Sequence, residues 1–301
     1  MLDVCALVLS AGRNPAFWAT ERGVAIDATP PQREASHYLA IGAIYKDEAP
    51  YMREWIEFHR MVGVERFFLY DNRSVDDHLE VLAPYVERGE VTLRDWPMET
   101  RQPQAYQDCV ESHADDARWI AFIDLDEFLF SPAGKPLPEV LRRYERWPGV
   151  GVNWAVFGSS GHATRPAGPV TESYVARLWT PENRTIKTIA DPARVAHCPG
   201  VHRFQYTELG TVDENEYPVW GGQTKSESRS VLQINHYMIK SLEEYRLRSQ
   251  RPRPVPAPGQ EQHRREFDPD RVAAFERLGE RDEAILQYVP ALREALDLSP
   301  A

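Results

Sequence analysis

From residue 38 onward, short hydrophobic runs alternate with stripes of hydrophobic residues at helical spacing. The run 39–44 is typical of a buried strand, and intervals of four, three and four residues then indicate one helix face formed by Tyr51, Trp55, Phe58 and Val62. Further strands are predicted, with a helix in each interval, at 66–70, 91–93 and 119–123. Strands that alternate with helices of this length predict an α/β fold, in which helices flank a mostly parallel sheet.

The second half of the chain is less regular. Strands are predicted at 151–157 and 231–237, and Ser241 with Glu244 forms a capping box that opens a helix. Residues 251–260 are rich in proline, which predicts an extended linker, and 269–297 is predicted as one helical segment without β structure. The predicted organisation is therefore an N-terminal extension (1–37), a main domain (38–250), and a Pro-rich linker with a C-terminal helical appendage (251–301).

Composition narrows the classes of function. The 301 residues carry a formal net charge of −11, which argues against a nucleic-acid-binding protein because neutralising phosphates requires a concentrated basic surface. The three cysteines are too few and too scattered for a disulfide framework or a zinc site. No run approaches the ~20 apolar residues of a membrane-spanning helix. We therefore expect a cytoplasmic protein without a transmembrane segment.

Acidic residues follow three of the predicted strands. Asp124 and Asp126 come directly after the strand at 119–123, and residues two apart in an extended chain point the same way. Two hard oxygen ligands suit Mn²⁺ or Mg²⁺, although a helix cap or a solvated turn would also explain them. Acidic turns at 46–48 and 70–76 end two further strands, and parallel strands bring all three turns to one edge of the sheet. The sequence therefore predicts a metal site at this edge.

Four segments together resemble glycosyltransferase family 92 and related family 2-like enzymes, namely 46–77, 119–130, 152–162 and 234–245. The resemblance implies a GT-A fold for the main domain and a nucleotide-sugar donor, often UDP-galactose, used with inversion. It also implies that Lys46, Glu48 and Asp71 border the nucleotide. Asp124 and Asp126 would be the motif that binds the metal and the diphosphate.

The resemblance extends to the second half of the chain. His236 fits a third metal ligand, with a hydrogen-bonded core histidine as the alternative and His202 as the competing ligand. Lys240, Arg246 and Arg248 are candidates to clamp the diphosphate, or else belong to a solvated helix face. Trp154 and His162 are expected on the acceptor side, where an aromatic ring suits the apolar face of a sugar.

An inverting enzyme needs a carboxylate that deprotonates the acceptor hydroxyl. We take Asp191 as the candidate for this base, and the sequence offers three alternatives that it does not separate, Glu127, Glu208 and Asp213.

The combined hypothesis is a metal-dependent glycosyltransferase that moves a hexose, expected to be galactose, from a UDP-sugar to a hydroxyl of a glycan or small molecule. A sugar-phosphate nucleotidyltransferase is the nearest alternative, because residues 9–13 faintly match the glycine-rich phosphate loop of that group. A non-catalytic carbohydrate-binding protein is a further alternative. Basic residues within 246–253 and 263–265 would allow peripheral contact with a membrane, with a solvated linker as the other explanation.

Overall fold

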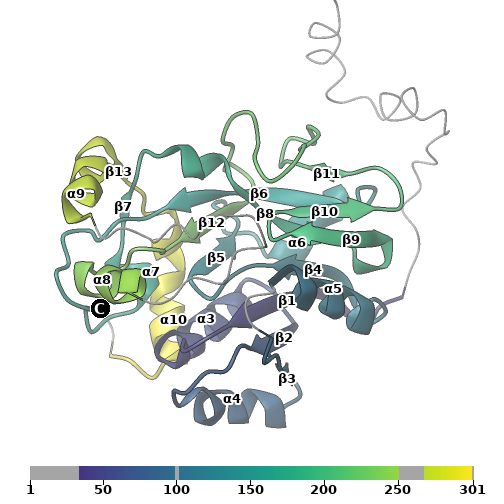
Figure 1. Ribbon diagram of the computed structural model, residues 1–301, viewed down its shortest axis with the longest axis horizontal. Helices are drawn as coiled ribbons and strands as arrows, with labels where there is room; N and C mark the ends of the chain where they lie inside the picture. The colour runs from purple at the N-terminus through teal and green to yellow at the C-terminus, as the bar shows by residue number, and fades with distance from the viewer. Residues whose placement is uncertain (1–33, 99–101, 251–267, 300–301) are drawn as a thin grey trace, which may run out of the picture.

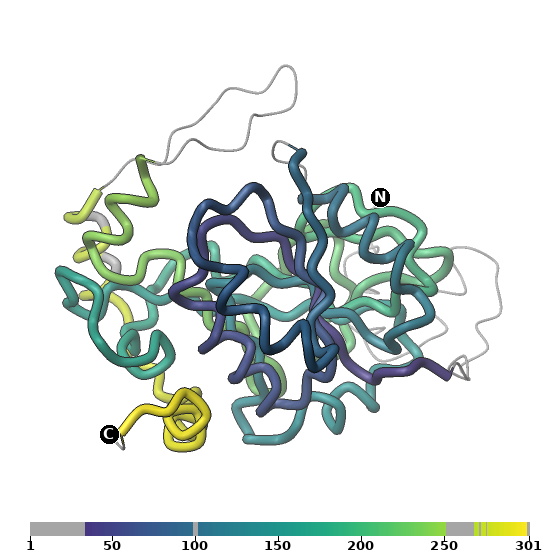
Figure 2. Tube along the Cα trace, turned by 90° about the horizontal axis from the view of Figure 1, so that it is seen from below, coloured from purple at the N-terminus to yellow at the C-terminus, as the bar shows by residue number. Residues whose placement is uncertain are grey.

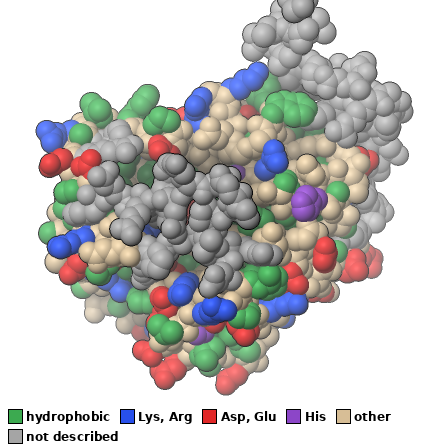
Figure 3. All heavy atoms as spheres, viewed as in Figure 1, with side chains coloured by type: hydrophobic (Ala, Val, Ile, Leu, Met, Phe, Trp, Pro, Cys, Tyr) green, Lys and Arg blue, Asp and Glu red, His purple; other side chains and the backbone are tan. Residues whose placement is uncertain are grey.

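The computed structural model describes residues 34–98, 102–250 and 268–299. Most of the predicted N-terminal extension therefore lies outside the described residues, as do the segment 9–13, the Pro-rich linker at 251–260 and the basic residues at 263–265. Within the described ranges, no helix combines the length and the apolar character needed to cross a bilayer. On the face shown in Figure 3, basic and acidic side chains of the described residues are interspersed and not separated by sign.

A nine-stranded sheet forms the centre of the molecule (Figure 1). Its strand order is β3-β2-β1-β4-β8-β6-β12-β5, and β11 pairs with β6. The strands are β1 (His37–Tyr45), β2 (Arg66–Asp71), β3 (Val91–Asp95), β4 (Ala117–Phe122), β5 (Glu127–Phe130), β6 (Gly149–Val156), β8 (Ile186–Ala190), β11 (Thr211–Val212) and β12 (Gln233–His236). Helices flank this sheet, and the predicted α/β fold class is confirmed.

The first half of the sheet is parallel and is covered by helices on both faces. Strands β3, β2, β1 and β4 pair in parallel, so that Tyr45 at the end of β1 lies beside Asp71 at the end of β2. Trp55 of α3 packs on one face and Cys109 of α5 on the other, where a Cβ at Gly42 would come within 3.0 Å of the Cys109 sulfur. The helices of this half are α3 (Ala49–Met61), α4 (His78–Glu87) and α5 (Gln102–His113).

The second half of the sheet is mixed. Strand β8 runs antiparallel between β4 and β6, and β5 runs antiparallel beside β12, whereas β6 and β12 point in the same direction as β4. The carboxyl ends of β1, β2, β4, β6 and β12 therefore share one edge of the sheet, and β5 and β8 begin at that edge. Neither β5 nor β8 is predicted from the sequence, and together they make the sheet less parallel than expected.

Shorter elements complete the main domain. Strands β9 (Val195–Gly200) and β10 (Arg203–Tyr206) form an antiparallel hairpin that contacts α5. Helix α8 (Leu242–Gln250) follows β12, and its predicted capping box is confirmed by hydrogen bonds of 3.1 and 3.2 Å exchanged between Ser241 and Glu244. The other short elements are α6 (Leu137–Leu141), η1 (Arg142–Tyr144), α7 (Val170–Ser173), β7 (Ala176–Arg177), η2 (Pro181–Arg184) and η3 (Pro192–Arg194).

The C-terminal segment is broken into several elements. The prediction of one helical segment without β structure is wrong, because strand β13 pairs with β7. Ile285 and Leu292 are fully buried in the main hydrophobic core, and the yellow C-terminal helix lies beside the purple α3 in Figure 2. The elements are α9 (Pro269–Leu278), β13 (Glu280–Arg281), η4 (Ala284–Tyr288) and α10 (Val289–Ala295).

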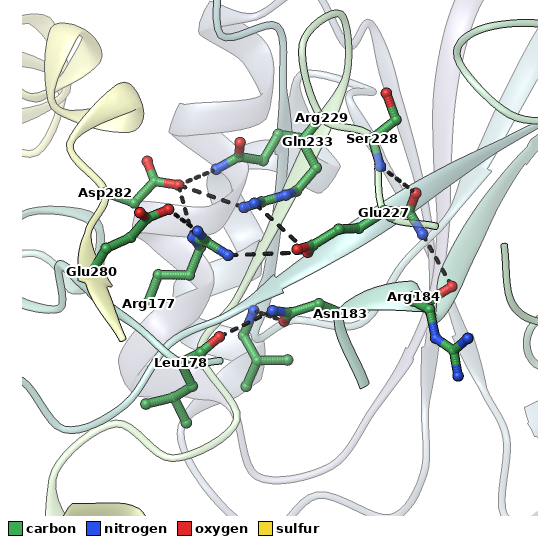
Figure 4. Close-up of polar contacts among 12 residues, drawn as sticks. Arg177, Leu178, Asn183, Arg184, Glu227, Ser228, Arg229, Gln233, Glu280 and Asp282 are labelled. Carbon is green, nitrogen blue, oxygen red and sulfur yellow. Dashed lines mark hydrogen bonds and ion pairs between the residues drawn. The ribbon is translucent and has the colours of Figure 1, made fainter. Parts of the chain in front are cut away.

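An ion cluster around the buried Arg177 joins β7 to this segment and to the loop before β12 (Figure 4). The guanidinium of Arg177 contacts Glu280 and lies 3.8 Å from Asp282 and 4.0 Å from Glu227. Gln233 at the start of β12 donates a hydrogen bond of 3.1 Å to Asp282. A charge removed from water needs such partners, so the cluster holds the C-terminal segment against the main domain.

Candidate active site

The acidic segment after β4 forms a tight turn that leads directly into β5. The N–H of Glu127 donates to the carbonyl of Asp124 at 3.0 Å, and the Asp124 N–H donates to Oε2 of Glu127 at 2.9 Å. The N–H of Tyr237, the residue after β12, donates to the carbonyl of Asp126 at 2.8 Å. These bonds fix the turn at the sheet edge where β4 and β12 end.

Asp126, Glu127 and His236 form a trio of candidate metal ligands. One ligand atom from each lies within 4.8 Å of the others, and all three residues are buried. Nε2 of His236 is 3.6 Å from Oδ2 of Asp126 and 4.0 Å from Oε1 of Glu127. Within the described residues, this Glu127 oxygen has no hydrogen-bond partner although it is buried. Two carboxylates and an imidazole in this arrangement fit a divalent cation such as Mn²⁺ or Mg²⁺.

Asp124 meets a different set of partners. Its Oδ1 accepts hydrogen bonds from Gln102 at 2.6 Å and Tyr106 at 3.3 Å, and its Oδ2 pairs with Lys187 at 2.9 Å. The trio therefore differs from the predicted ligand set at one position, where Glu127 takes the place of Asp124. The reason is local, because the chain turns after β4 instead of continuing extended. The Asp124 side chain remains 32% exposed and is accessible to a ligand from solvent.

Lys187 is a site residue missing from the sequence-based prediction. It is fully buried on β8, with Nζ 2.9 Å from Asp124 and 3.6 Å from Glu127. Burial acts to lower the pKa of Lys187, but the two carboxylates outweigh it and hold the pKa well above its usual value, so the lysine stays charged. The available signal was a lone lysine inside the β-rich run TIKTIA at 185–190.

The acidic cluster, formed by Asp124, Asp126 and Glu127, is short of positive charge despite Lys187. Burial raises the pKa of Glu127 well above its usual range, and Lys187 offsets this only in part while the neighbouring aspartates raise it further. Burial also acts to raise the pKa of Asp126, but Arg248 and His236 outweigh it and hold this pKa well below its usual range. A cation bound at the trio would relieve the remaining repulsion between the carboxylates.

Two basic residues of the segment after β12 border the cluster. Arg248 of α8 pairs with Oδ2 of Asp126 at 2.5 Å. Lys240 lies 3.6 Å from Glu48, and its Nζ is 3.3 Å from the centre of the Tyr51 ring. Burial lowers the pKa of Lys240, whereas Glu48 and Asp126 act to raise it. The structure thus brings Glu48, Lys240 and Arg248, which were predicted to bind the nucleotide, to the neighbourhood of the acidic turn.

Lys46 and Asp71 lie at the same sheet edge but have other surroundings. Lys46 follows β1 and is exposed. Asp71 ends β2, where its carboxylate accepts the N–H of Ser74 at 2.9 Å and lies 3.7 Å from His78. Because β1 separates β2 from β4, Asp71 stands two strands away from the acidic turn. The role of both residues at the nucleotide stays a prediction.

Asp191, the predicted base, lies at the opposite ends of the strands, on the side where β4 begins. It follows the last residue of β8, four residues after Lys187, which corresponds to about 13 Å along the strand. Its carboxylate is buried and pairs with Arg118 at 2.5 Å. This position corrects the prediction, because β8 runs antiparallel to β4 and carries Asp191 away from the acidic turn.

Of the three alternative bases, Glu127 alone is part of the cluster. Glu208 has an exposed side chain paired with Arg194 at 3.1 Å. The carboxylate of Asp213 accepts the N–H groups of Asn215 and Tyr217 at 2.9 and 3.0 Å, which caps a turn. Neither of these two carboxylates is oriented by a partner from the acidic turn.

Aromatic and histidine rings line the β6 side of the cluster. The ring of half-buried Trp154 lies 4.3 Å from that of His236 and 5.1 Å from that of His202, centre to centre. Nδ1 of His202 is 2.9 Å from a backbone carbonyl of β8, and His202 is outside the ligand trio. His162 lies in the loop after β6, with Nε2 3.1 Å from the carbonyl of Ser173. Trp154 is therefore beside the trio, and an acceptor role for either residue stays a prediction.

The sequence model of glycosyltransferase family 92 matches residues 38–267, a range that contains the whole cluster. The chain belongs to glycosyltransferase family 92. This confirms the family predicted from the four sequence segments. The match covers the turn after β4, strand β8 with Lys187, and helix α8 with Arg248, so all elements of the candidate site lie within the family 92 region.

Individual relatives agree with this assignment. A glycosyltransferase family 92 protein of Oryza sativa subsp. japonica is 32% identical over 202 residues, which are 62% of this chain and 35% of that protein. The galactan β-1,4-galactosyltransferase GALS2 of Arabidopsis thaliana is 32% identical over 128 residues, which are 38% of this chain and 25% of that protein. The chain spans 35–37% of the length of the first three curated relatives.

One similar solved structure is that of S. aureus TarS 1-349 in complex with UDP-GlcNAc. It is 9% identical, has a TM-score of 0.39, and its alignment covers 86% of this chain and 72% of that chain.

Proposed function

We propose that this family 92 chain is a metal-dependent glycosyltransferase that moves galactose from UDP-galactose to a hydroxyl of a glycan or small molecule, with inversion. The observation that carries the proposal is the trio of Asp126, Glu127 and His236 beside the basic residues Lys240 and Arg248. A divalent cation next to basic side chains suits a diphosphate. The galactan galactosyltransferases among the relatives support galactose as the sugar.

The acidic residues and Lys187 have separate tasks in this proposal. Asp126, Glu127 and His236 would hold the metal ion, which supplies Lewis-acid stabilisation of the leaving diphosphate when it is bound. Lys187 neutralises the inner part of the cluster and orients Asp124 through their 2.9 Å ion pair. The exposed part of the Asp124 carboxylate is then free to accept a hydrogen bond from a hydroxyl of the donor.

The remaining residues surround the reacting groups. Lys240 and Arg248 bring positive charge to the phosphates, and burial of Lys240 strengthens its interaction with an anion. Trp154 offers ring surface beside His236, where the apolar face of a sugar can pack. We assign no base, because the side chain of Glu127 is fully enclosed and belongs to the ligand trio.

A thermal-shift panel tests the donor site. Binding to the folded state raises the melting temperature. A ligand at a hundred times its Kd adds about 2.7 kcal/mol to the free energy of unfolding. We expect UDP with Mn²⁺ to stabilise the protein and Asp126→Ala to remove the metal-dependent part of the shift. If no nucleoside diphosphate stabilises the protein with or without metal, the donor-site assignment is wrong.

The reaction products separate this proposal from the nucleotidyltransferase alternative. A glycosyltransferase releases the nucleoside diphosphate, whereas a nucleotidyltransferase releases pyrophosphate. Family 92 membership supports the former, and the segment 9–13 that suggested the latter lies outside the described residues. A carbohydrate-binding protein without activity would release neither product.

A further inference from the structure

Two cationic side chains pair with the acidic turn, and they differ in how firmly they are held. Lys187 pairs with Asp124 and Glu127 from inside the sheet, where its side chain is fully buried. Arg248 of helix α8 pairs with Asp126, and the Arg248 side chain is 33% exposed. A buried lysine on a central strand has no route out of the cluster, whereas a partly exposed guanidinium on a helix can leave by a change of rotamer.

Arg248 pairs with a carboxylate oxygen to which the metal ion would also bind. Its Nη1 lies 2.5 Å from Oδ2 of Asp126, and Nε2 of His236 approaches the same oxygen at 3.6 Å. This Nη1 also donates a hydrogen bond of 3.1 Å to the carbonyl of Met238. A divalent cation held by the trio and a guanidinium on the same carboxylate oxygen repel each other. The two are therefore competitors for Asp126.

The diphosphate supplies the alternative partner for the displaced arginine. Arginine pairs with phosphate oxygens through its planar fork of N–H donors, and the charge-assisted bonds formed are among the strong ones in proteins. Lys240 already has other partners, because it lies 3.6 Å from Glu48 and its Nζ is 3.3 Å from the centre of the Tyr51 ring.

We propose that Arg248 is a displaceable counter-ion of the metal site, bound to Asp126 while no divalent cation is present and transferred to the donor diphosphate when the cation binds. This rests on the proposed function, since it takes the trio as the metal site and a nucleoside diphosphate as the ligand. In this arrangement, binding of the metal ion and binding of the diphosphate are coupled. The metal ion releases the arginine that the diphosphate needs, and the diphosphate accepts the arginine that opposes the metal ion.

The coupling predicts effects of opposite sign from a single substitution. In Arg248→Ala the cation no longer has to displace a guanidinium, so Mn²⁺ alone should bind about tenfold more tightly. UDP in saturating Mn²⁺ should bind about tenfold more weakly, because one charge-assisted contact is lost. In Arg248→Lys both changes should be smaller, since an ammonium keeps the charge but lacks the bidentate geometry. A purely structural role of Arg248 would weaken both ligands together.

The experiment measures Mn²⁺ binding without nucleotide, from the electron paramagnetic resonance of free Mn²⁺, and then UDP binding by calorimetry in saturating Mn²⁺. It uses the full chain as wild type, Arg248→Ala, Arg248→Lys and Arg246→Ala. Arg246 is the matched control, because the structure leaves it exposed on the same helix and, among the described residues, gives it no ion pair with the acidic turn. Asp126→Ala supplies the reference without the shared carboxylate, and circular dichroism confirms the helix content of each variant.

We expect tighter Mn²⁺ and weaker UDP for Arg248→Ala, intermediate values for Arg248→Lys, and wild-type values for Arg246→Ala. Unchanged or weaker Mn²⁺ binding in both Arg248 variants overturns the counter-ion role while leaving the metal site intact. Failure of the wild type to bind Mn²⁺ even with UDP overturns the metal assignment of the proposed function, and the counter-ion role with it. The two failures are thus distinguished by the wild-type titration alone.

Discussion

Replacing Lys187 by methionine removes the charge at the inner end of the acidic cluster and keeps most of the side-chain volume. Lys187 is fully buried, with Nζ 2.9 Å from Asp124 and 3.6 Å from Glu127. Removing one partner of a buried ion pair leaves the other charge uncompensated, which lowers the free energy of unfolding by about 3–5 kcal/mol. The corresponding fall in melting temperature is roughly 6–20 °C.

A surface lysine in a similar pair provides the control. Lys135 lies 2.5 Å from Glu139, but the two side chains are 57% and 55% exposed, so Lys135→Met should change the free energy of unfolding by less than about 1 kcal/mol. Urea denaturation followed by circular dichroism at pH 7.5 measures both variants. Mn²⁺ should restore part of the stability lost in Lys187→Met, because it returns positive charge to the cluster, and should not differ in its effect between Lys135→Met and the wild type. If Lys187→Met unfolds within about 1 kcal/mol of the wild type, the cluster does not depend on Lys187 and the electrostatic reasoning is refuted.

Three further predictions concern residues around the sheet. His59 is fully buried and burial lowers its pKa to about 3, so the folded state takes up the proton less readily than the unfolded chain, and stability is lost as the pH falls from about 6.5 toward 3. Between pH 6.5 and 4.5 the wild type should lose about 2–3 kcal/mol more than His59→Leu in urea denaturation, and equal losses would contradict this. Asp191→Asn should lower the free energy of unfolding by about 3–5 kcal/mol, because Arg118 then lacks its buried partner, yet keep the thermal shift from UDP with Mn²⁺; loss of that shift would return Asp191 to the site. Trp154→Ala should raise the KM for the acceptor about tenfold, by removal of about 1–2 kcal/mol of ring contact, and leave UDP binding unchanged in calorimetry, whereas an unchanged acceptor KM would remove it from the acceptor side.

The parallel half of the sheet was predictable because its signals are local. Each strand from β1 to β4 is a short hydrophobic run that ends at a polar turn, and each intervening helix carries one buried stripe. Strand β5 lacks such a signal, and β8 offers only the short run TIKTIA, which a lysine interrupts. Residues 127–130 continue the hydrophobic run of β4 after a tight turn, and residues 186–190 become a strand only by inserting antiparallel between β4 and β6. Their existence is decided by pairing with distant strands, which a local pattern does not contain.

The difference between local signals and pairing with distant strands also separates the site residues that were predicted from those that were not. The rule that strands of one direction end at one edge predicts Asp126 at the site, whereas His236 was implied by the resemblance to the family. Glu127 in place of Asp124 depends on the turn after β4, which breaks the two-residue alternation of an extended chain. Lys187 was not among the predicted site residues and Asp191 was, because the direction of β8, which decides which end of the strand meets the acidic turn, was not predicted.

Release of UDP from UDP-galactose is the measurement that tests the central claim most directly. The wild-type chain is incubated with UDP-galactose, Mn²⁺ and a panel of glycan and small-molecule acceptors, and UDP and pyrophosphate are quantified together with the galactosylated product. We predict that UDP is released in a one-to-one ratio to galactose transferred, that a chelator abolishes the release, and that Asp126→Ala and His236→Ala reduce it by at least about a hundredfold, or 2.7 kcal/mol of transition-state stabilisation. Release of pyrophosphate, or UDP release that neither the chelator nor these two substitutions diminish, would contradict the account.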